Sequence, residues 1–287
     1  MTGSTTLIAR RSIRSRIGRT VAIIVAVMAG VSFVSGSFVL ADSLKSSIDG
    51  FISELVQNTD LVVRAERAFD QDDFQGDSAR EPIPIDIADD VRAVAGIDIV
   101  EPDIQRSASV LDADGDVITT TGPQFGVVWD GESLAGVTLK EGRKPDGAGE
   151  IVLDKATADR ENFAVGDSVS YATDTGTYEA TLGGTIGTKD TDSLVGATIV
   201  ALDLPTALDH YGADGRVDAI NLSITDDADL ATVKAAVQDA VPAGIEVIDR
   251  DELIAETQDS IGQFIDIFQT GLLVFAFVTA FVAAFII

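Results

Sequence analysis

Residues 217–250 read VDAINLSITDDADLATVKAAVQDAVPAGIEVIDR, and this stretch decides the fold of the soluble part of the chain. Apolar and polar residues alternate over 217–225, as in a strand with one buried face. Residues 229–240 have helical spacing, with an aspartate at the start and Pro242 just beyond the end. Residues 245–250 are a second short strand pattern. The stretch therefore predicts a β-α-β unit.

A matching unit precedes it. Residues 61–65 (LVVRA) have a strand pattern, residues 87–96 predict a short helix ended by glycine, and residues 97–107 predict another strand. Residues 70–80 between them predict a polar loop. Two β-α-β units commonly share one four-stranded sheet with both helices on one face, so we expect a ferredoxin-like lobe from 42–107 and 217–266.

The segment 108–216 predicts a β-rich inserted lobe. It contains short strand patterns separated by the turn signals Asp114-Gly115 and Asp146-Gly147, and a short helix is expected over 205–210. The strand patterns are VITTT, FGVVW, EIVL, DSVSYAT and TYEATLGG.

Two stretches without charge flank this domain, residues 20–41 and 267–287. At about 1.5 Å per residue each reaches roughly 30 Å, the thickness of the hydrocarbon core of a bilayer. We therefore expect an α+β membrane protein with two transmembrane helices around an extracytoplasmic domain, residues 42–266. No basic residue follows the second stretch, which we interpret as the truncation of a longer chain.

The first nineteen residues predict the orientation of the chain. They contain five arginines, and positively charged segments stay on the cytoplasmic side. Residues 1–19 are therefore expected to form an amphipathic segment at the inner membrane surface of a multi-pass protein in the cell membrane. Contact with a cytoplasmic partner is a second role for this segment. The five arginines are Arg10, Arg11, Arg14, Arg16 and Arg19.

Alternatives remain for the apolar segments. The first apolar segment resembles a signal peptide with a cleavage site near Ala41. However, its apolar run is longer than that of a usual signal peptide, and it continues into an amphipathic pattern at 40–57. Residues 253–268 have the same helical pattern before the second span, so we expect two stalk helices that extend from the membrane. Small residues recur at four-residue spacing in both spans, which fits either close helix packing or ordinary membrane composition.

Charge limits the possible partners. The chain has 20 basic and 47 acidic residues, for a formal net charge of -27. Such a surface repels nucleic acid, which we exclude as a partner. The chain has no cysteine, so disulfides, thiolate nucleophiles and cysteine-type zinc sites are excluded as well.

The residues predict no enzyme active site, no cofactor and no metal site in this chain. Residues 112–116 (DADGD) resemble the start of a calcium loop, but an EF-hand loop needs glycine at its sixth position, where this chain has Val117, and glutamate at its twelfth, so we predict a hairpin turn instead. His210 is the only histidine and is expected to be a partly exposed structural residue. Residues 183–187 (GGTIG) match no phosphate-binding motif and predict a strand with a bulge or tight bend. The paired aspartates at 72–73, 89–90 and 226–227 are expected to be solvated or helix N-terminal charges.

The chain resembles the MacB/FtsX-type ABC transporter permeases through their MacB-like periplasmic core domain. The matching stretches begin at LIARRSIRSR, LKEGRKPDGAGEIVLD and RVDAINLSIT. The central stretch carries a family-like run that we interpret as turn and core positions. Its residues are Gly142, Arg143, Pro145, Glu150, Val152, Leu153, Val165, Gly166 and Asp167.

The resemblance implies a permease subunit that pairs as a homodimer or pseudo-dimer and binds a cytoplasmic ABC ATPase. ATP would then be a cofactor of that partner, and the outer domain would move or extract lipid, lipoprotein or hydrophobic compounds. Family permeases have at least four spans, and this chain ends before the ATPase-contacting helix. Two alternatives stay open: a two-span sensor receptor with an outer ligand-binding domain, and an FtsX-like regulator of a cell-wall hydrolase.

Overall fold

The structure is a computed structural model. It describes residues 21, 28, 30–43, 45–46, 50, 56–67, 80–112, 114–120, 122–131, 134, 136–147, 149–189, 191–192 and 196–286. The chain divides into two compact units, Met1–Phe51 with Thr257–Ile287 and Ile52–Glu256.

The strands are β1 (Leu61–Ala65), β2 (Ile83–Pro84), β3 (Ile97–Asp103), β4 (Gln105–Leu111), β5 (Gln124–Val128), β6 (Val137–Gly142), β7 (Glu150–Asp154), β8 (Ser168–Thr173), β9 (Gly176–Thr188), β10 (Thr198–Leu202), β11 (Arg216–Val217), β12 (Ala219–Ile224) and β13 (Ile245–Asp249). The helices are α2 (Ile87–Arg92), α3 (Lys155–Glu161), α4 (Leu204–His210), α5 (Leu230–Ala240) and α6 (Arg250–Ile286).

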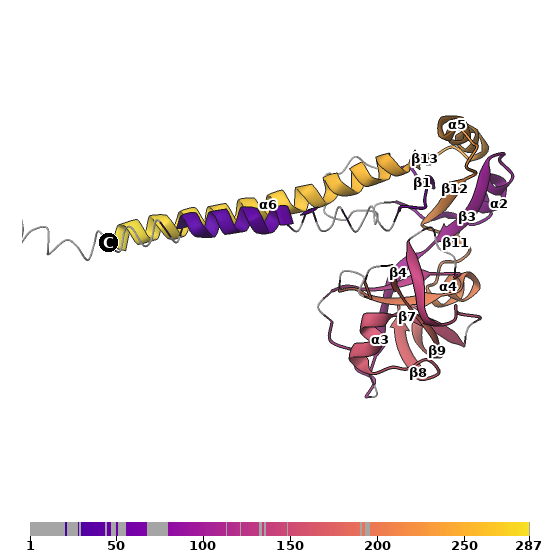
Figure 1. Ribbon diagram of the computed structural model, residues 1–287, viewed down its shortest axis with the longest axis horizontal. Coiled ribbons are helices and arrows are strands. Elements are labelled where there is room, and N and C mark those ends of the chain that lie inside the picture. Colours follow the sequence, from indigo (N-terminus) through magenta and orange to yellow (C-terminus); the bar gives the residue numbers. More distant parts are fainter. Residues whose placement is uncertain are drawn as a thin grey trace, which may run out of the picture. The chain divides into compact units, whose positions relative to one another are not determined.

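One sheet unites the two β-α-β units (Figure 1). Its strand order is β13-β1-β12-β3, and every neighbouring pair is antiparallel. Helices α2 and α5 contact each other as well as strands of this sheet. Asp229 caps α5, because its side chain accepts a hydrogen bond from the backbone N of Thr232. This order is that of a ferredoxin-like lobe, so the prediction of one shared four-stranded sheet is confirmed.

A second sheet forms the inserted lobe, in the order β6-β9-β7-β10-β5-β4-β8. The long strand β9 also pairs with β8, so six of the seven strands close into a small barrel and β6 is added at β9. Gly183 is an extra residue in β9, because Ile151 lies opposite Leu182 and Val152 opposite Gly184. This register shift confirms the bulge expected at 183–187.

The prediction of one strand over 97–107 is wrong. Strand β3 ends at Asp103 and belongs to the four-stranded sheet, whereas β4 starts at Gln105 and belongs to the barrel. Between them Ile104 is fully buried. Alternation of apolar and polar residues continues across the junction, so the pattern did not show that the chain passes from one sheet to another.

Other elements differ from expectation. The helix at 87–96 is shorter and ends at Arg92, while Gly96 adopts a φ of +92° that favours glycine. The described residues of VITTT form no strand: Val117 forms an isolated bridge with Leu111, and the backbone N of Ile118 donates to the Val110 carbonyl at 3.0 Å. The sequence contains no clear pattern that predicted strands β6 and β10 or helix α3. The short helix expected at 205–210 is confirmed as α4.

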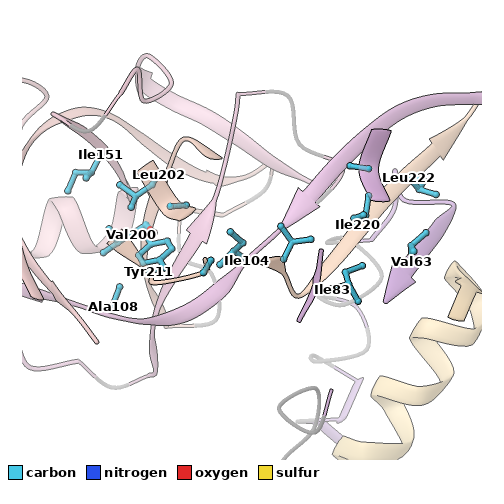
Figure 2. Packing of buried hydrophobic residues seen from close by; sticks show 14 of the residues in the cluster. Val63, Ile83, Ile104, Ala108, Ile151, Val200, Leu202, Tyr211, Ile220 and Leu222 are labelled. Atoms are coloured by element: carbon cyan, nitrogen blue, oxygen red, sulfur yellow. Dashed lines mark hydrogen bonds between the residues drawn. The ribbon is translucent and has the colours of Figure 1, made fainter. Parts of the chain in front are cut away.

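The core of the Ile52–Glu256 unit is continuous. One cluster of buried residues includes Val63, Ile220 and Leu222 of the four-stranded sheet together with Val200 and Leu202 of the barrel. Figure 2 shows Ile104 between these two groups. Because interiors pack closely, a shared core makes the two lobes behave as one body.

The Met1–Phe51 and Thr257–Ile287 unit contains helical residues 30–43 and most of α6. Helix α6 begins directly after β13 and continues for 37 residues without interruption. The helix predicted at 253–268 is therefore confirmed as part of a longer one. Of the stalk expected at 40–57, several residues lie outside the described ones.

Candidate functional site at the base of helix α6

The first residue of α6 is tied to the loop before β1. The backbone N of Arg250 donates to the Asp60 carbonyl at 3.1 Å, and its Nε donates to the Thr59 carbonyl at 2.6 Å. Its Nη2 also lies 2.7 Å from Asp60 Oδ1. The other Asp60 oxygen accepts from the backbone N of Ile224 at 2.9 Å. Asp60 thus connects the start of α6 to β12 of the sheet.

Arg64 is a buried cation next to the last residue of β1. Its side chain is only 5% exposed, and its Nε lies 2.9 Å from Oε1 of Glu246, the residue directly opposite on β13. Its Nη2 donates to Glu256, in the second turn of α6. One guanidinium therefore connects both strands to the helix. The planar fork of arginine suits such a double contact, because its donors point in fixed directions.

Two further arginines meet the same carboxylates. Arg80 donates to Glu246 Oε1 at 2.6 Å, to Glu256 Oε1 at 2.9 Å and to the Ala65 carbonyl at 2.6 Å. Arg67 also forms an ion pair with Glu256. We call Arg64, Arg67, Arg80, Glu246 and Glu256 the arginine cluster.

The charge state of Glu256 follows from these neighbours. Its partial burial by itself raises the pKa, but the hydrogen bonds and positive charges of Arg64 and Arg80 outweigh burial and lower the pKa below its ordinary value. Glu256 is therefore ionised at neutral pH. Separation of this carboxylate from buried Arg64 would leave a cation without part of its compensation, which is costly.

Lys234 of α5 adds a third attachment. Its Nζ lies 2.8 Å from Asp249 Oδ2 at the end of β13 and also pairs with Glu252 in the first turn of α6. The hydrogen bond from Lys234 lowers the pKa of Asp249. Helix α6 is thus fastened to β1, β13, α5 and the 59–60 loop. These contacts hold residues 250–256, the first turns of α6, against the four-stranded sheet of the same unit.

Sequence reasoning missed the arginine cluster. The available signal was Arg64, a charged residue within the apolar strand LVVRA. A cation in such a place predicts buried carboxylate partners, but their positions 182 and 192 residues away depend on the fold.

The site residues singled out from the sequence lie elsewhere. Arg10, Arg11, Arg14, Arg16 and Arg19 are outside the described residues, as are the aspartates at 72–73 and all of the 70–80 loop except Arg80. The described residues of the segment, 112 and 114–116, form a hairpin turn, as predicted, in which the backbone N of Asp112 donates to the Asp116 carbonyl at 2.9 Å. Asp112 Oδ1 accepts from the backbone N of Asp114 and of Asp116, both at 2.9 Å.

His210 is buried at the end of α4, which corrects the expectation of partial exposure. Its ring stacks on Tyr178 at a centroid distance of 3.7 Å, and its Nδ1 lies 2.6 Å from the Tyr171 hydroxyl. Burial lowers its pKa, although Asp209 and Asp203 oppose the shift. The two tyrosine rings cover the histidine, so the sequence-based expectation overestimated its exposure.

The family-like central run forms turns. Gly142 has a φ of +75°, and the backbone N of Arg143 donates to Gly183 at the β9 bulge at 2.9 Å. The Arg143 side chain pairs with Glu150. At the other end, Asp167 Oδ2 accepts from the backbone N of Ala164 at 2.8 Å. Val152 and Leu153 of the same run are fully buried in β7, so the interpretation of the run as turn and core positions is confirmed.

The part of the chain that the structure describes contains no helix long and apolar enough to cross a membrane.

A family model and one solved structure support this fold. The model of the MacB-like periplasmic core domain family matches residues 20–240. The periplasmic region of MacB from Actinobacillus actinomycetemcomitans is 18% identical, with a TM-score of 0.51, over 75% of this chain and 95% of that one. The extracellular domain of the noncanonic ABC-type transporter YknZ from Gram-positive bacteria has a TM-score of 0.45 and 8% identity, over 66% of this chain and 98% of that one. No curated protein matches the chain.

The sheet order, the inserted lobe and the match over residues 20–240 lead to one conclusion. The chain belongs to the MacB-like periplasmic core domain family, the periplasmic domain of MacB/FtsX-type ABC transporter permeases.

Proposed function

We propose that this chain is the N-terminal part of a permease subunit in an ABC transporter. In this proposal a cytoplasmic ATPase hydrolyses ATP, and the permease converts the resulting motion into movement of its outer domain. Family membership supports this assignment. The chain itself supplies no catalytic group and needs no cofactor, because the chemistry belongs to the ATPase.

The proposal places residues 20–41 and 267–287 across the cell membrane, with residues 42–266 on the outer side. Its support is the absence of charge in both stretches and the arginines before the first. The same arginines would contact anionic lipid at the inner surface.

The observation that carries the proposal is the continuity of α6. The helix runs from the sheet edge at Arg250 to Ile286, about 55 Å at 1.5 Å per residue. Its base is held by the arginine cluster and by Arg250. An uninterrupted helix transmits displacement, whereas a flexible linker would absorb it.

The cargo class in this proposal is lipid, lipoprotein or another hydrophobic compound, and the working unit is a homodimer or pseudo-dimer. Two outer domains would then change their mutual angle during each ATPase cycle.

The test is to reconstitute the permease that contains this chain, which we call the parent permease, together with its ATPase in liposomes. The proposal predicts that the two co-purify and that ATP drives release of a fluorescent lipid, with no release when a non-hydrolysable ATP analogue is used. A parent protein that binds no ATPase and instead carries a signalling domain would contradict the proposal.

A further inference from the structure

His210 fastens the end of helix α4 to the hairpin of strands β8 and β9. Its ring is stacked on Tyr178 of β9 with 13° between the two planes, and its Nδ1 lies 2.6 Å from the hydroxyl of Tyr171 on β8. Its backbone carbonyl accepts hydrogen bonds from the hydroxyl groups of Thr173 at 2.7 Å and Thr175 at 2.5 Å. Both the ring and the backbone of this one residue therefore hold the end of the helix.

The contacts of the ring favour its neutral form. The Nε2 atom lies 3.9 Å from the carboxylate of Asp209, so we assign the single proton of the neutral ring to Nε2. The Nδ1 atom then accepts the hydrogen bond of the Tyr171 hydroxyl. Tyr171 is fully buried, and burial raises its pKa. Tyr171 therefore keeps its proton and remains a donor to the histidine.

A second proton on the ring would remove this acceptor. Protonated Nδ1 is itself a donor, and among the described residues the Tyr171 hydroxyl has no other acceptor. The new charge would also lie at a residue that is only 7% exposed, where a cation loses most of its hydration. Protonation therefore penalises the docked position of α4 relative to a position in which the ring contacts water.

Two aspartates at the ends of α4 oppose this effect. Asp209 precedes the histidine and its side chain is 86% exposed, and Asp203 is the N-cap residue of the helix. The titratable groups that the described structure places around the ring are these two carboxylates, Tyr171 of β8 and Tyr178 of β9. Burial is the largest influence, and it lowers the pKa of His210 below the ordinary 6.5 in spite of both carboxylates.

We propose that His210 is a pH-sensitive latch, which holds the end of α4 on the β8–β9 hairpin at neutral pH and releases it in acid. The inference rests on the proposed function only for the place of the latch, on the outer side of the membrane, where the external pH acts on it. The stability of the docked form is complete above pH 6.5, the ordinary pKa, and is lost as pH falls through the lower pKa of the folded protein.

The titration of the latch can be measured directly, because His210 is the only histidine. We would label the imidazole ring of the full chain with carbon-13 and follow its one NMR signal in neutral maltoside micelles, from about pH 8 to about pH 4.5. We expect a pKa below 6.5. Tyr171→Phe should raise this pKa, because the lost hydroxyl supports only the neutral ring. Neither measurement depends on a substitution at His210.

Release of α4 is measured by hydrogen exchange of residues 204–213. The backbone N of Tyr211 in this segment donates to the Ala207 carbonyl at 3.0 Å. After correction for the intrinsic rate of exchange, protection should fall by up to about tenfold for each pH unit below 6.5, because opening takes up one proton. Helix α5, Leu230–Ala240, is the internal reference and should keep its protection.

Two variants distinguish a latch from an ordinary structural contact. His210→Gln cannot be protonated, so protection of α4 should no longer depend on pH between about 7 and about 5. Thr175→Ala removes a hydroxyl that contacts the His210 carbonyl but leaves the ring in place. It should lower protection of α4 at neutral pH and leave the dependence on pH unchanged.

Three results would overturn the inference. A His210 pKa at or above 6.5 would mean that the folded protein does not penalise the charged ring. Equal loss of protection in wild type and His210→Gln would assign the acid response to another group, such as the buried Asp154. An unchanged His210 pKa in Tyr171→Phe would remove the hydrogen bond from the latch. Export by the parent permease in the absence of acid release would leave the proposed function intact, and acid release without export would do the reverse.

Discussion

The guanidinium of Arg64 on β1 donates a hydrogen bond to the carboxylate of Glu256 on α6, although 192 positions separate the two residues. Arg64 is almost fully buried, whereas Glu256 is 26% exposed. The pair connects the middle of the four-stranded sheet to the second turn of the long helix. Separation of the second turn of α6 from β1 would have to break this hydrogen bond, because charge-assisted hydrogen bonds are directional.

The first prediction concerns Glu256→Gln. At neutral pH the variant should lower the free energy of unfolding by about 1–3 kcal/mol, because Arg64 and Arg80 lose a charged partner while a hydrogen-bond acceptor remains. Urea unfolding followed by Trp129 emission measures this difference. Asp259→Asn, an exposed residue on the same helix, is the control and should have little effect.

The same variant should change the response to acid. The pKa of Glu256 is lowered in the folded protein, so its contribution to stability is complete above the ordinary value of 4.5 and is lost as pH falls through the folded-state pKa. Wild type should therefore lose more stability than Glu256→Gln below about pH 4.5. If the two proteins differ by the same amount at pH 7 and at low pH, the ion pairs of Glu256 do not stabilise the fold.

A second prediction tests the barrel core. At Gly126 on β5, an added Cβ would lie 2.5 Å from the ring of Tyr211, whose hydroxyl donates to the Val200 carbonyl at 2.8 Å. Gly126→Ala should lower the free energy of unfolding by about 1–3 kcal/mol, because the ring is held inside a close-packed core. Gly149→Ala, where the added Cβ meets nothing within 4 Å, is the matched control. Equal stabilities of the two variants would show that Tyr211 does not pack against β5.

Local signals predicted the ferredoxin-like lobe well. Asp229 before α5 and the alternation of β12 are properties of short segments, and each survives in the structure. The barrel was harder to predict. Strand β10 lies in the closed barrel and β6 is added at β9, so the pairing of both depends on residues far away in sequence, and β10 is buried at every position. A strand that is buried on both faces, such as β10, does not alternate between apolar and polar residues. The periodicity that identifies a half-buried strand is therefore missing from its sequence.

The candidate site could be predicted less well than the fold. Arg64 was visible as a charged residue in an apolar strand, but Arg80 follows a polar stretch and Glu256 is one of many acidic residues. With 47 carboxylates available, only three-dimensional proximity selects the two that meet the arginines. Long-range ion pairs leave no spacing rule in the sequence.

A third prediction tests the membrane topology. The chain has no cysteine, so single cysteines report their own position. In intact cells a membrane-impermeant maleimide should label Asp174→Cys, in the exposed β8–β9 turn, but should label Ser4→Cys only after the cells are opened. Immunoblots of the labelled parent protein measure both. Labelling of both cysteines in intact cells would contradict the proposed orientation.

The most direct test of rigid coupling lengthens α6 in two ways. A seven-residue Gly-Ser insertion after Asp259, and a second after Ser46, would replace rigid connections with flexible ones, whereas an AEAAKAA insertion at each point adds two helical turns, about 10 Å. ATP-driven release of lipid by the reconstituted parent transporter should fall at least about tenfold with the flexible pair of insertions and be largely retained with the helical pair, because only the helix transmits force. ATP hydrolysis should continue in both. Transport that survives the flexible insertions at the wild-type rate would contradict the account, since the outer unit would then move without a stiff connection to the membrane.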